Sequence, residues 1–193
     1  YEGRGDLLGE FNSSDLILVV TTAGEFFTTS FDASNHYPEN ILLIEKFDSS
    51  KVWTAVLNDA DQGYPYLKRF TFEATARPQR YLGDNEKSSL IVLTDAPGAR
   101  FLLTFGGDDA FRGTLEVIAS EFVAVKSYKA KGKRLTTFTL ESVTELEPVE
   151  VEEPQEVEAE EIEVTDDDNV DAEPERSDDE VRDELTGQHR LFD

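Results

Sequence analysis

Hydrophobic and polar residues alternate over short runs through the first three quarters of the chain. Four runs can be aligned with one another, and they cover residues 15–31, 51–70, 89–105 and 121–138. In each run, apolar and β-branched residues lead to a glycine, and a second apolar stretch follows it. Alternation over about four to eight residues is typical of a strand with one buried face. The pattern therefore predicts β-hairpins, and we expect the first 146 residues to be all-β.

Two landmark residues recur in the four runs. The turn glycines are Gly24, Gly63, Gly98 and Gly132, spaced 39, 35 and 34 residues apart. The closing phenylalanines are Phe31, Phe70, Phe105 and Phe138. Glycine enters the φ > 0 region of a tight turn without steric cost, and a ring at a fixed offset is expected to be buried in each unit. Hairpins repeated at this period predict a propeller-like or solenoid array and disfavour a sandwich.

The alternation stops near Glu147. Residues 147–176 are acidic, contain three prolines and lack aromatic side chains, so we expect a disordered linker. Residues 177–193 regain helix signals: Ser177 and Glu180 match a capping box, and Gly187 can end the helix. The sequence thus predicts a β domain over 1–146, a linker over 147–176, and a short helix with a terminal peptide over 177–193.

Charge is divided as unevenly as hydrophobicity. The chain of 193 residues has a formal net charge of −24, but residues 1–145 hold 15 basic against 21 acidic residues, and residues 146–193 hold 3 against 21. Most of the excess negative charge therefore belongs to the tail, and the first part must be judged by its local patches. With no cysteine, disulfides, thiolate zinc sites and a cysteine nucleophile are excluded.

No apolar run of about 18 residues is present, so we expect no membrane span. The chain starts at Tyr1 and contains no methionine, and we interpret it as a fragment of a longer protein. Only two histidines occur, His36 and His189, and neither has metal-ligand spacing. The stretch FGGDDAFRG (105–113) lacks the alternating oxygen ligands of a calcium loop and is interpreted as a tight turn. We expect no metal site, no ATP-binding loop and no other cofactor in this chain.

Five cations without an intervening acid occupy the last run, between residues 126 and 138. They are Lys126, Lys129, Lys131, Lys133 and Arg134. Such like charges on one hairpin are unfavourable unless an anion compensates them, as a phosphate backbone does. Further candidate DNA-binding residues in the earlier runs are Lys68, Arg69, Arg77, Arg80 and Arg100. If the hairpins lie side by side, all of these cations form a stripe along an outer rim that contacts DNA with little base specificity. The alternative is a solvated hairpin that prevents edge-to-edge aggregation.

Three segments resemble the C-terminal region of the A subunits of bacterial type II DNA topoisomerases. They read KVWTAVLNDADQGYPYLKRFTFEA (51–74), LIVLTDAPGARFLLTFGGDDAFR (90–112) and FVAVKSYKAKGKRLTTFTLESVTELEP (122–148). The end of the chain, DEVRDELTGQHRLFD, is also similar to the end of those proteins. The gyrase and topoisomerase IV A subunits of the Bacteroidetes lineage show the closest resemblance.

This resemblance implies a β-pinwheel, a propeller-like disc whose blades exchange strands, here with an incomplete set of blades. It implies that double-stranded DNA bends around the basic perimeter and is presented for ATP-dependent strand passage, relaxation or decatenation in the cytoplasm, near the nucleoid. The ATPase B subunit is the implied partner, and ATP and Mg²⁺ belong to the whole enzyme. The catalytic tyrosine lies in a part absent here, so no catalytic residue is assigned, to Tyr1 or elsewhere.

One family motif is missing. Gyrases typically carry a box similar to Gln-Arg-Arg-Gly-Gly-Lys-Gly, and KAKGKR (129–134) is only loosely similar to it. The box could lie upstream, or the enzyme could relax and decatenate DNA without supercoiling it. We favour the topoisomerase IV-like interpretation.

The tail suggests two further roles. Its negative charge, tethered beside a basic rim, is expected to compete with DNA, although it could serve solubility alone. Gln188, Leu191 and Phe192 resemble the short peptides that dock on the sliding clamp, although His189 and Arg190 depart from the usual middle residues. A hydrophobic end that folds back on the domain is the alternative. A propeller-like protein-interaction module with a clamp-binding tail and no direct DNA role is the second functional hypothesis.

Overall fold

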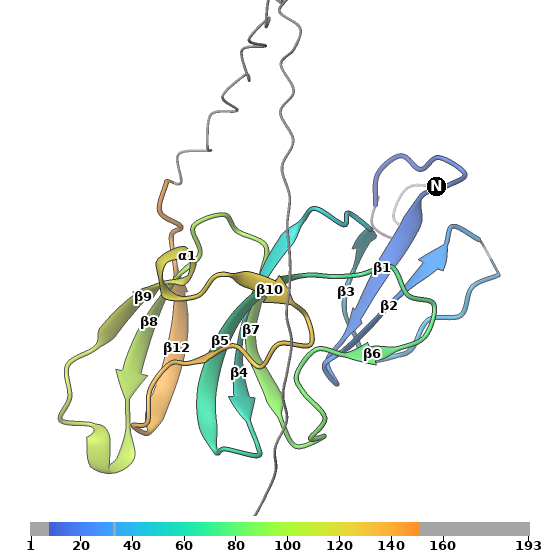
Figure 1. Ribbon diagram of the computed structural model, residues 1–193. Coiled ribbons are helices and arrows are strands. Elements are labelled where there is room, and N and C mark those ends of the chain that lie inside the picture. Colours follow the sequence, from blue (N-terminus) through green and yellow to red (C-terminus); the bar gives the residue numbers. More distant parts are fainter. Residues whose placement is uncertain (1–7, 33, 151–193) are drawn as a thin grey trace, which may run out of the picture. The chain divides into compact units, whose positions relative to one another are not determined.

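The computed structural model describes residues 8–32 and 34–150, which form three β-sheets (Figure 1). Sheet I has the order β3-β1-β2-β6 and consists of β1 (Leu16–Thr21), β2 (Glu25–Ser30), β3 (Ile41–Lys46) and β6 (Gln79–Arg80). Sheet II has the order β10-β5-β4-β7, and it consists of β4 (Val52–Asp59), β5 (Tyr64–Thr71), β7 (Ser89–Thr94) and β10 (Val125–Ser127), with β11 (Lys133–Arg134) also paired to β5. Sheet III has the order β12-β8-β9, from β8 (Arg100–Phe105), β9 (Leu115–Ile118) and β12 (Leu140–Leu146).

Helical structure is confined to two short turns in the described part of the chain. They are the 3₁₀ turn η1 (Gly107–Asp109) and the single-turn helix α1 (Ala119–Phe122). No helix among residues 8–32 and 34–150 is long and apolar enough to cross a membrane. Of the predicted linker (147–176), residues 147–150 are described and form neither helix nor strand. The rest of the linker, the predicted terminal helix and the residues Gln188, Leu191 and Phe192 lie outside the described residues.

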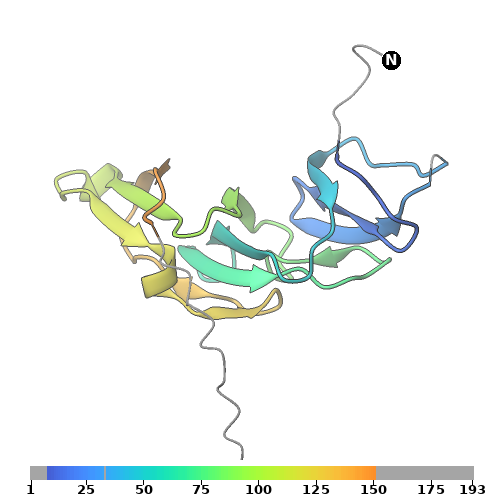
Figure 2. The ribbon, with the colours of Figure 1, turned by 90° about the horizontal axis from the view of Figure 1, so that it is seen from above.

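Sheet II lies between the other two sheets and contributes to both hydrophobic clusters (Figure 2). Strand alternation divides its side chains: Trp53 and Phe70 belong to the cluster shared with sheet I, whereas Val56 and Leu67 belong to the cluster shared with sheet III. The strict two-residue period of a strand produces this division. Both faces of the middle sheet are therefore buried around β4, where residues 53–57 are buried without interruption.

Aromatic rings dominate the cluster between sheets I and II. Phe26 of β2 contacts Phe72 with ring centroids 4.5 Å apart and Tyr128 with centroids 4.8 Å apart. Tilted and edge-on ring pairs of this kind contribute about 0.5–1.5 kcal/mol beyond their buried area. Because Tyr128 comes from the last run, this cluster joins the end of the domain to its first hairpin.

The prediction of an all-β, pinwheel-like fold is confirmed. All four turn glycines adopt positive φ, with values of 79°, 70°, 70° and 93° for Gly24, Gly63, Gly98 and Gly132. The first two runs form the expected hairpins, β1–β2 and β4–β5.

The prediction that every run is one hairpin is wrong for the last two. In the third run, β7 pairs with β4 of sheet II and β8 joins sheet III, so the turn at Gly98 connects two sheets. In the fourth run, β10 and β11 both pair with β5 and not with each other. The reason is packing across sheets, because Val92 of β7 and Phe101 of β8 enter the same cluster from opposite sheets. Strands are thus exchanged between blades.

The closing phenylalanines are buried in the second and third runs but not in the first and fourth. Phe70 and Phe105 are buried as predicted, but Phe31 is 69% exposed and Phe138 is 38% exposed. Phe31 stacks on Phe11 outside the core, and Phe138 contacts the edge of Phe105. A fixed offset from the glycine therefore buries the ring only where the second strand continues into a cluster.

Tyr81 offers a test of the aromatic cluster. Its hydroxyl is buried without a hydrogen-bond partner among the described residues. Tyr81→Phe should raise the free energy of unfolding by about 1 kcal/mol, because an unsatisfied buried group is removed and the ring is kept. Urea denaturation measures this change. Tyr128→Phe is the matched control and should give no gain, since that hydroxyl lies 3.5 Å from Gln79 Oε1. A clear decrease in stability in Tyr81→Phe would contradict the account.

Candidate nucleic-acid interface

The predicted basic hairpin is a segment that covers the free edge of β5. We call residues 125–134 the basic segment. Its first part, β10, runs parallel to β5 with Val125 opposite Arg69, and its last part, β11, runs antiparallel with Lys133 opposite Leu67. The Leu135 N–H continues this edge by donating to Pro65 O at 2.9 Å. Both ends of the segment are therefore fixed by β5, with the Tyr128 side chain buried and the charged side chains facing solvent.

Gly132 permits the close approach of the segment to β5. Its φ is +93°, and a Cβ at this position would lie 2.5 Å from Leu67 O and 2.8 Å from Lys68 Cβ. Both distances are shorter than real side chains tolerate, and one of the contacts is with backbone. Only glycine fits here, for steric as well as conformational reasons.

The five cations of the basic segment are all exposed. Four of them lie over aromatic rings within about 6 Å of the centroid, which is the range of a cation–π contact. These pairs are Lys129 on Tyr128 at 5.5 Å, Lys131 on Tyr66 at 5.2 Å, Lys133 on Phe122 at 4.3 Å, and Arg134 on Tyr64 at 4.9 Å. Long cationic side chains commonly bury their stems on apolar surface and keep the charge in water. The rings thus limit where each charge can lie without neutralising it.

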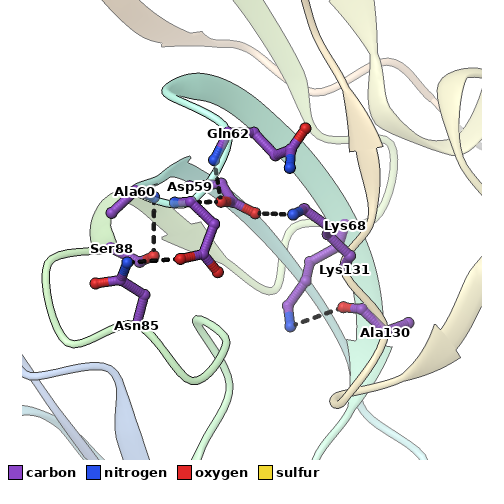
Figure 3. A network of polar contacts seen from close by, with 9 residues as sticks. Asp59, Ala60, Gln62, Lys68, Asn85, Ser88, Ala130 and Lys131 are labelled. Carbon is purple, nitrogen blue, oxygen red and sulfur yellow. Dashed lines mark hydrogen bonds and ion pairs between the residues drawn. The ribbon is translucent and has the colours of Figure 1, made fainter.

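Lys131 differs from the other four cations because it has an internal counterion. Its Nζ lies 2.6 Å from Asp59 Oδ2, within the network drawn in Figure 3. Burial alone raises the pKa of the Asp59 carboxyl, but hydrogen bonds from Lys131 and from the backbone N–H groups of Gln62 and Asp61 outweigh it, so the pKa is lowered. The same hydrogen bond raises the pKa of Lys131. Among the described residues, the others form no ion pair: Lys126, Lys129, Lys133 and Arg134.

Lys68 does not face solvent, contrary to the prediction. It is only 3% exposed, and its Nζ donates to the carbonyl oxygens of Tyr128 at 2.6 Å, Ala130 at 3.2 Å and Tyr81. Burial lowers the pKa of Lys68 to about 8. This ammonium cannot contact an external phosphate while the basic segment is in place.

The remaining predicted cations do not complete a continuous stripe. Arg69 is half-buried on β5 beside the basic segment, with Nη1 3.5 Å from Val123 O. Arg80 donates to three carbonyl oxygens, those of Ala23, Gly83 and Asn85, and so ties loops together. Arg100, on sheet III, pairs with Glu116 at 3.2 Å. Arg77 is exposed beside β6, which belongs to sheet I and not to the sheet that holds the basic segment. The structure therefore reduces the predicted stripe to the basic segment and Arg69.

A model of the topoisomerase C-terminal domain of Bacteroidota matches residues 1–147. The chain belongs to this family. The match confirms the resemblance found in the sequence, and it ends one residue beyond β12, so it includes all three sheets. No curated protein matches the chain.

Sequence inspection missed two features of this topoisomerase C-terminal domain. Asp59, the counterion of Lys131, is 72 residues away in sequence, and nothing local identifies it. Arg112 lies over the ring of Phe138 at 3.4 Å and pairs with Asp109, whose other carboxylate oxygen accepts from Thr139 N at 2.9 Å. The glycine-rich stretch 105–113 is a turn, as interpreted from the sequence, and its own Asp109 holds it through these contacts.

A pair of glycine substitutions tests the fit of the basic segment. Gly132→Ala should lower the free energy of unfolding of the topoisomerase C-terminal domain by about 2–4 kcal/mol, since strain at positive φ adds to a clash with Leu67 O. Gly63→Ala is the matched control: its φ is +70°, but the added Cβ meets nothing within 4 Å, so a decrease of about 1 kcal/mol is expected. Both decreases are measured by urea denaturation. Equal decreases would show that the segment does not contact β5 closely at Gly132.

Proposed function

We propose that this topoisomerase C-terminal domain binds and bends double-stranded DNA for a type II topoisomerase. The observation that carries the proposal is the basic segment, in which four exposed cations have no ion-pair partner among residues 8–32 and 34–150 and are held on one strand edge. Clustered positive charge of this kind is relieved when the cations neutralise DNA phosphates, which releases the counterions condensed on the DNA. Family membership supports the association with topoisomerases.

The geometry favours contact with the DNA backbone over reading of bases. The cations project from a sheet edge, and α1, with four residues, is too short to serve as a recognition helix. Contacts to phosphate fix position and carry little sequence information. We therefore expect similar affinity for duplexes of different sequence.

The parent enzyme that fits this proposal is topoisomerase IV-like. It would relax or decatenate DNA by strand passage, with ATP and Mg²⁺ required by the whole enzyme and ATP hydrolysed by its B subunit, while the catalytic tyrosine comes from a different region of the parent chain. KAKGKR (129–134) departs from the gyrase box and is only loosely similar to it, and this departure supports the choice of topoisomerase IV over gyrase. We place its action in the cytoplasm, at the nucleoid. Competition by the acidic tail and clamp docking through Gln188, Leu191 and Phe192 stay predictions.

Neutralising the free cations tests DNA binding. The fourfold variant carries Lys126→Gln, Lys129→Gln, Lys133→Gln and Arg134→Gln. The slope of log affinity against log salt concentration should become shallower by about 0.9 for each phosphate that the variant no longer neutralises. The change should be the same for duplexes of unrelated sequence. Fluorescence anisotropy across a salt series measures both quantities. Lys46→Gln is the control and should change little, because Lys46 already pairs with Asp15 at 2.7 Å. Wild-type affinity in the fourfold variant would favour the protein-interaction alternative.

Bending is tested separately from binding. Nicked DNA circles are ligated in the presence of the full chain, and the linking number is read after the protein is removed. A curved path along the basic segment should shift the linking number with one sign, and the fourfold variant should leave the circles close to relaxed. Tight binding by the wild type without any shift would mean that the domain holds DNA but does not bend it.

A further inference from the structure

We propose that Lys68 is a positioning residue for this interface: it holds residues 128–132 against β5 and thereby sets where Lys129 and Lys131 meet phosphate. The proposal rests on the DNA-binding function above. It assigns to a buried lysine, which cannot touch DNA in this structure, control over two lysines that can.

Lys68 connects three segments of the chain: its own strand β5, the loop after β6 and the basic segment. On β5, Lys68 lies on the same face as Tyr66 and Phe70, so it enters the cluster between sheets I and II. Its Nζ donates to carbonyl oxygens of Tyr81, Tyr128 and Ala130. An ammonium has three protons and no acceptor, so these three carbonyls satisfy it completely.

The loop needs this donor because the ladder is interrupted there. The last pair of β10 is Ser127 with Thr71, and the first pair of β11 is Lys133 with Leu67. Residues 128–132 bridge the gap without a ladder pair to β5. Lys68 supplies the donor that strand pairing supplies elsewhere, and without it two carbonyls near the core would lose their partner.

The loop in turn presents two lysines to solvent. Lys129 lies on the ring of Tyr128, whose own carbonyl accepts from Lys68. Lys131 follows Ala130, the second acceptor, and reaches Asp59. Lys68 lines a small cavity of about 180 Å³. The other titratable residues that line it come from three places: Asp59 and Asp61 from the end of β4 and the turn after it, Tyr81 and Asp84 from the loop after β6, and Lys129 and Lys131 from the basic segment.

Opening of the loop should depend on pH, because the pKa of Lys68 differs between the closed and the open loop. Burial lowers the pKa of Lys68 to about 8, and opening of the loop would return it toward the ordinary value of 10.5. The open state therefore binds more protons between pH 8 and 10.5, so a rise in pH through this range favours the closed loop. A loop held by backbone and surface contacts alone would show no such dependence.

The test compares two variants of the full chain, Lys68→Met and the control Lys129→Gln. At neutral pH, Lys68→Met should speed amide exchange of residues 128–132 and weaken binding to a duplex about tenfold at about 0.1 M salt for each phosphate that the displaced loop no longer reaches. Lys129→Gln removes one exposed charge from the same loop and breaks no ion pair among the described residues, so it should weaken binding but leave the exchange rates unchanged. The difference between the variants separates positioning from charge.

A second measurement needs no substitution. In the wild type, the opening equilibrium of residues 128–132, corrected for intrinsic exchange, should fall as the pH rises from 8 to 10, by at most about tenfold per pH unit. In Lys68→Met it should be independent of pH. Loop exchange that does not respond to pH in the wild type overturns the proposal even if Lys68→Met fails to fold.

The outcomes also distinguish this proposal from the function on which it rests. If the wild type binds DNA, and Lys68→Met binds with the same affinity and salt dependence, the positioning role is wrong and DNA binding stands. If the wild type does not bind DNA at all, both fail. Faster loop exchange together with weaker, less salt-dependent binding in Lys68→Met supports the role.

Discussion

The structure depends on covering the edge of β5 that faces away from β4. An uncovered edge leaves backbone N–H and C=O groups without partners and invites pairing with other chains. The basic segment covers this edge with two short strands of opposite direction, β10 and β11. Because the backbone does the covering, the charged side chains have no structural duty toward β5 and can face outward. One stretch of chain therefore closes a blade and presents a row of positive charge.

Burial separates the cations of this region into two kinds. Lys68 is withdrawn from water, and the cost of its desolvation, visible in its lowered pKa, is offset by three carbonyl acceptors. Lys129, Lys133 and Arg134 of the basic segment stay exposed and lie over aromatic rings. The first kind gives the loop its position, and the second gives the surface its charge. Counting basic residues along the sequence cannot distinguish the two.

Local patterns predicted what depends on local physics. Alternation located the strands that lie within the four runs, and the turn glycines have the expected positive φ, because both are decided by a few neighbouring residues. The four runs did not include β3, β6, β9 and β12. Partner choice was not predictable, since β7, β8, β10 and β11 are assigned to sheets by contacts with distant residues. Lys68 carried a signal that went unused: it continues the series Tyr64, Tyr66 and Phe70 on one face of β5, which indicates an inward position.

The central claim is that DNA lies on the basic segment, and lysine footprinting tests it most directly. Lysines of the full chain are acetylated with and without a duplex, and the modified positions are read by mass spectrometry. The account predicts that DNA protects Lys126, Lys129 and Lys133 and leaves Lys46 of sheet I and the exposed Lys87 as reactive as before. Protection of Lys46 or Lys87 with an unprotected basic segment would contradict it.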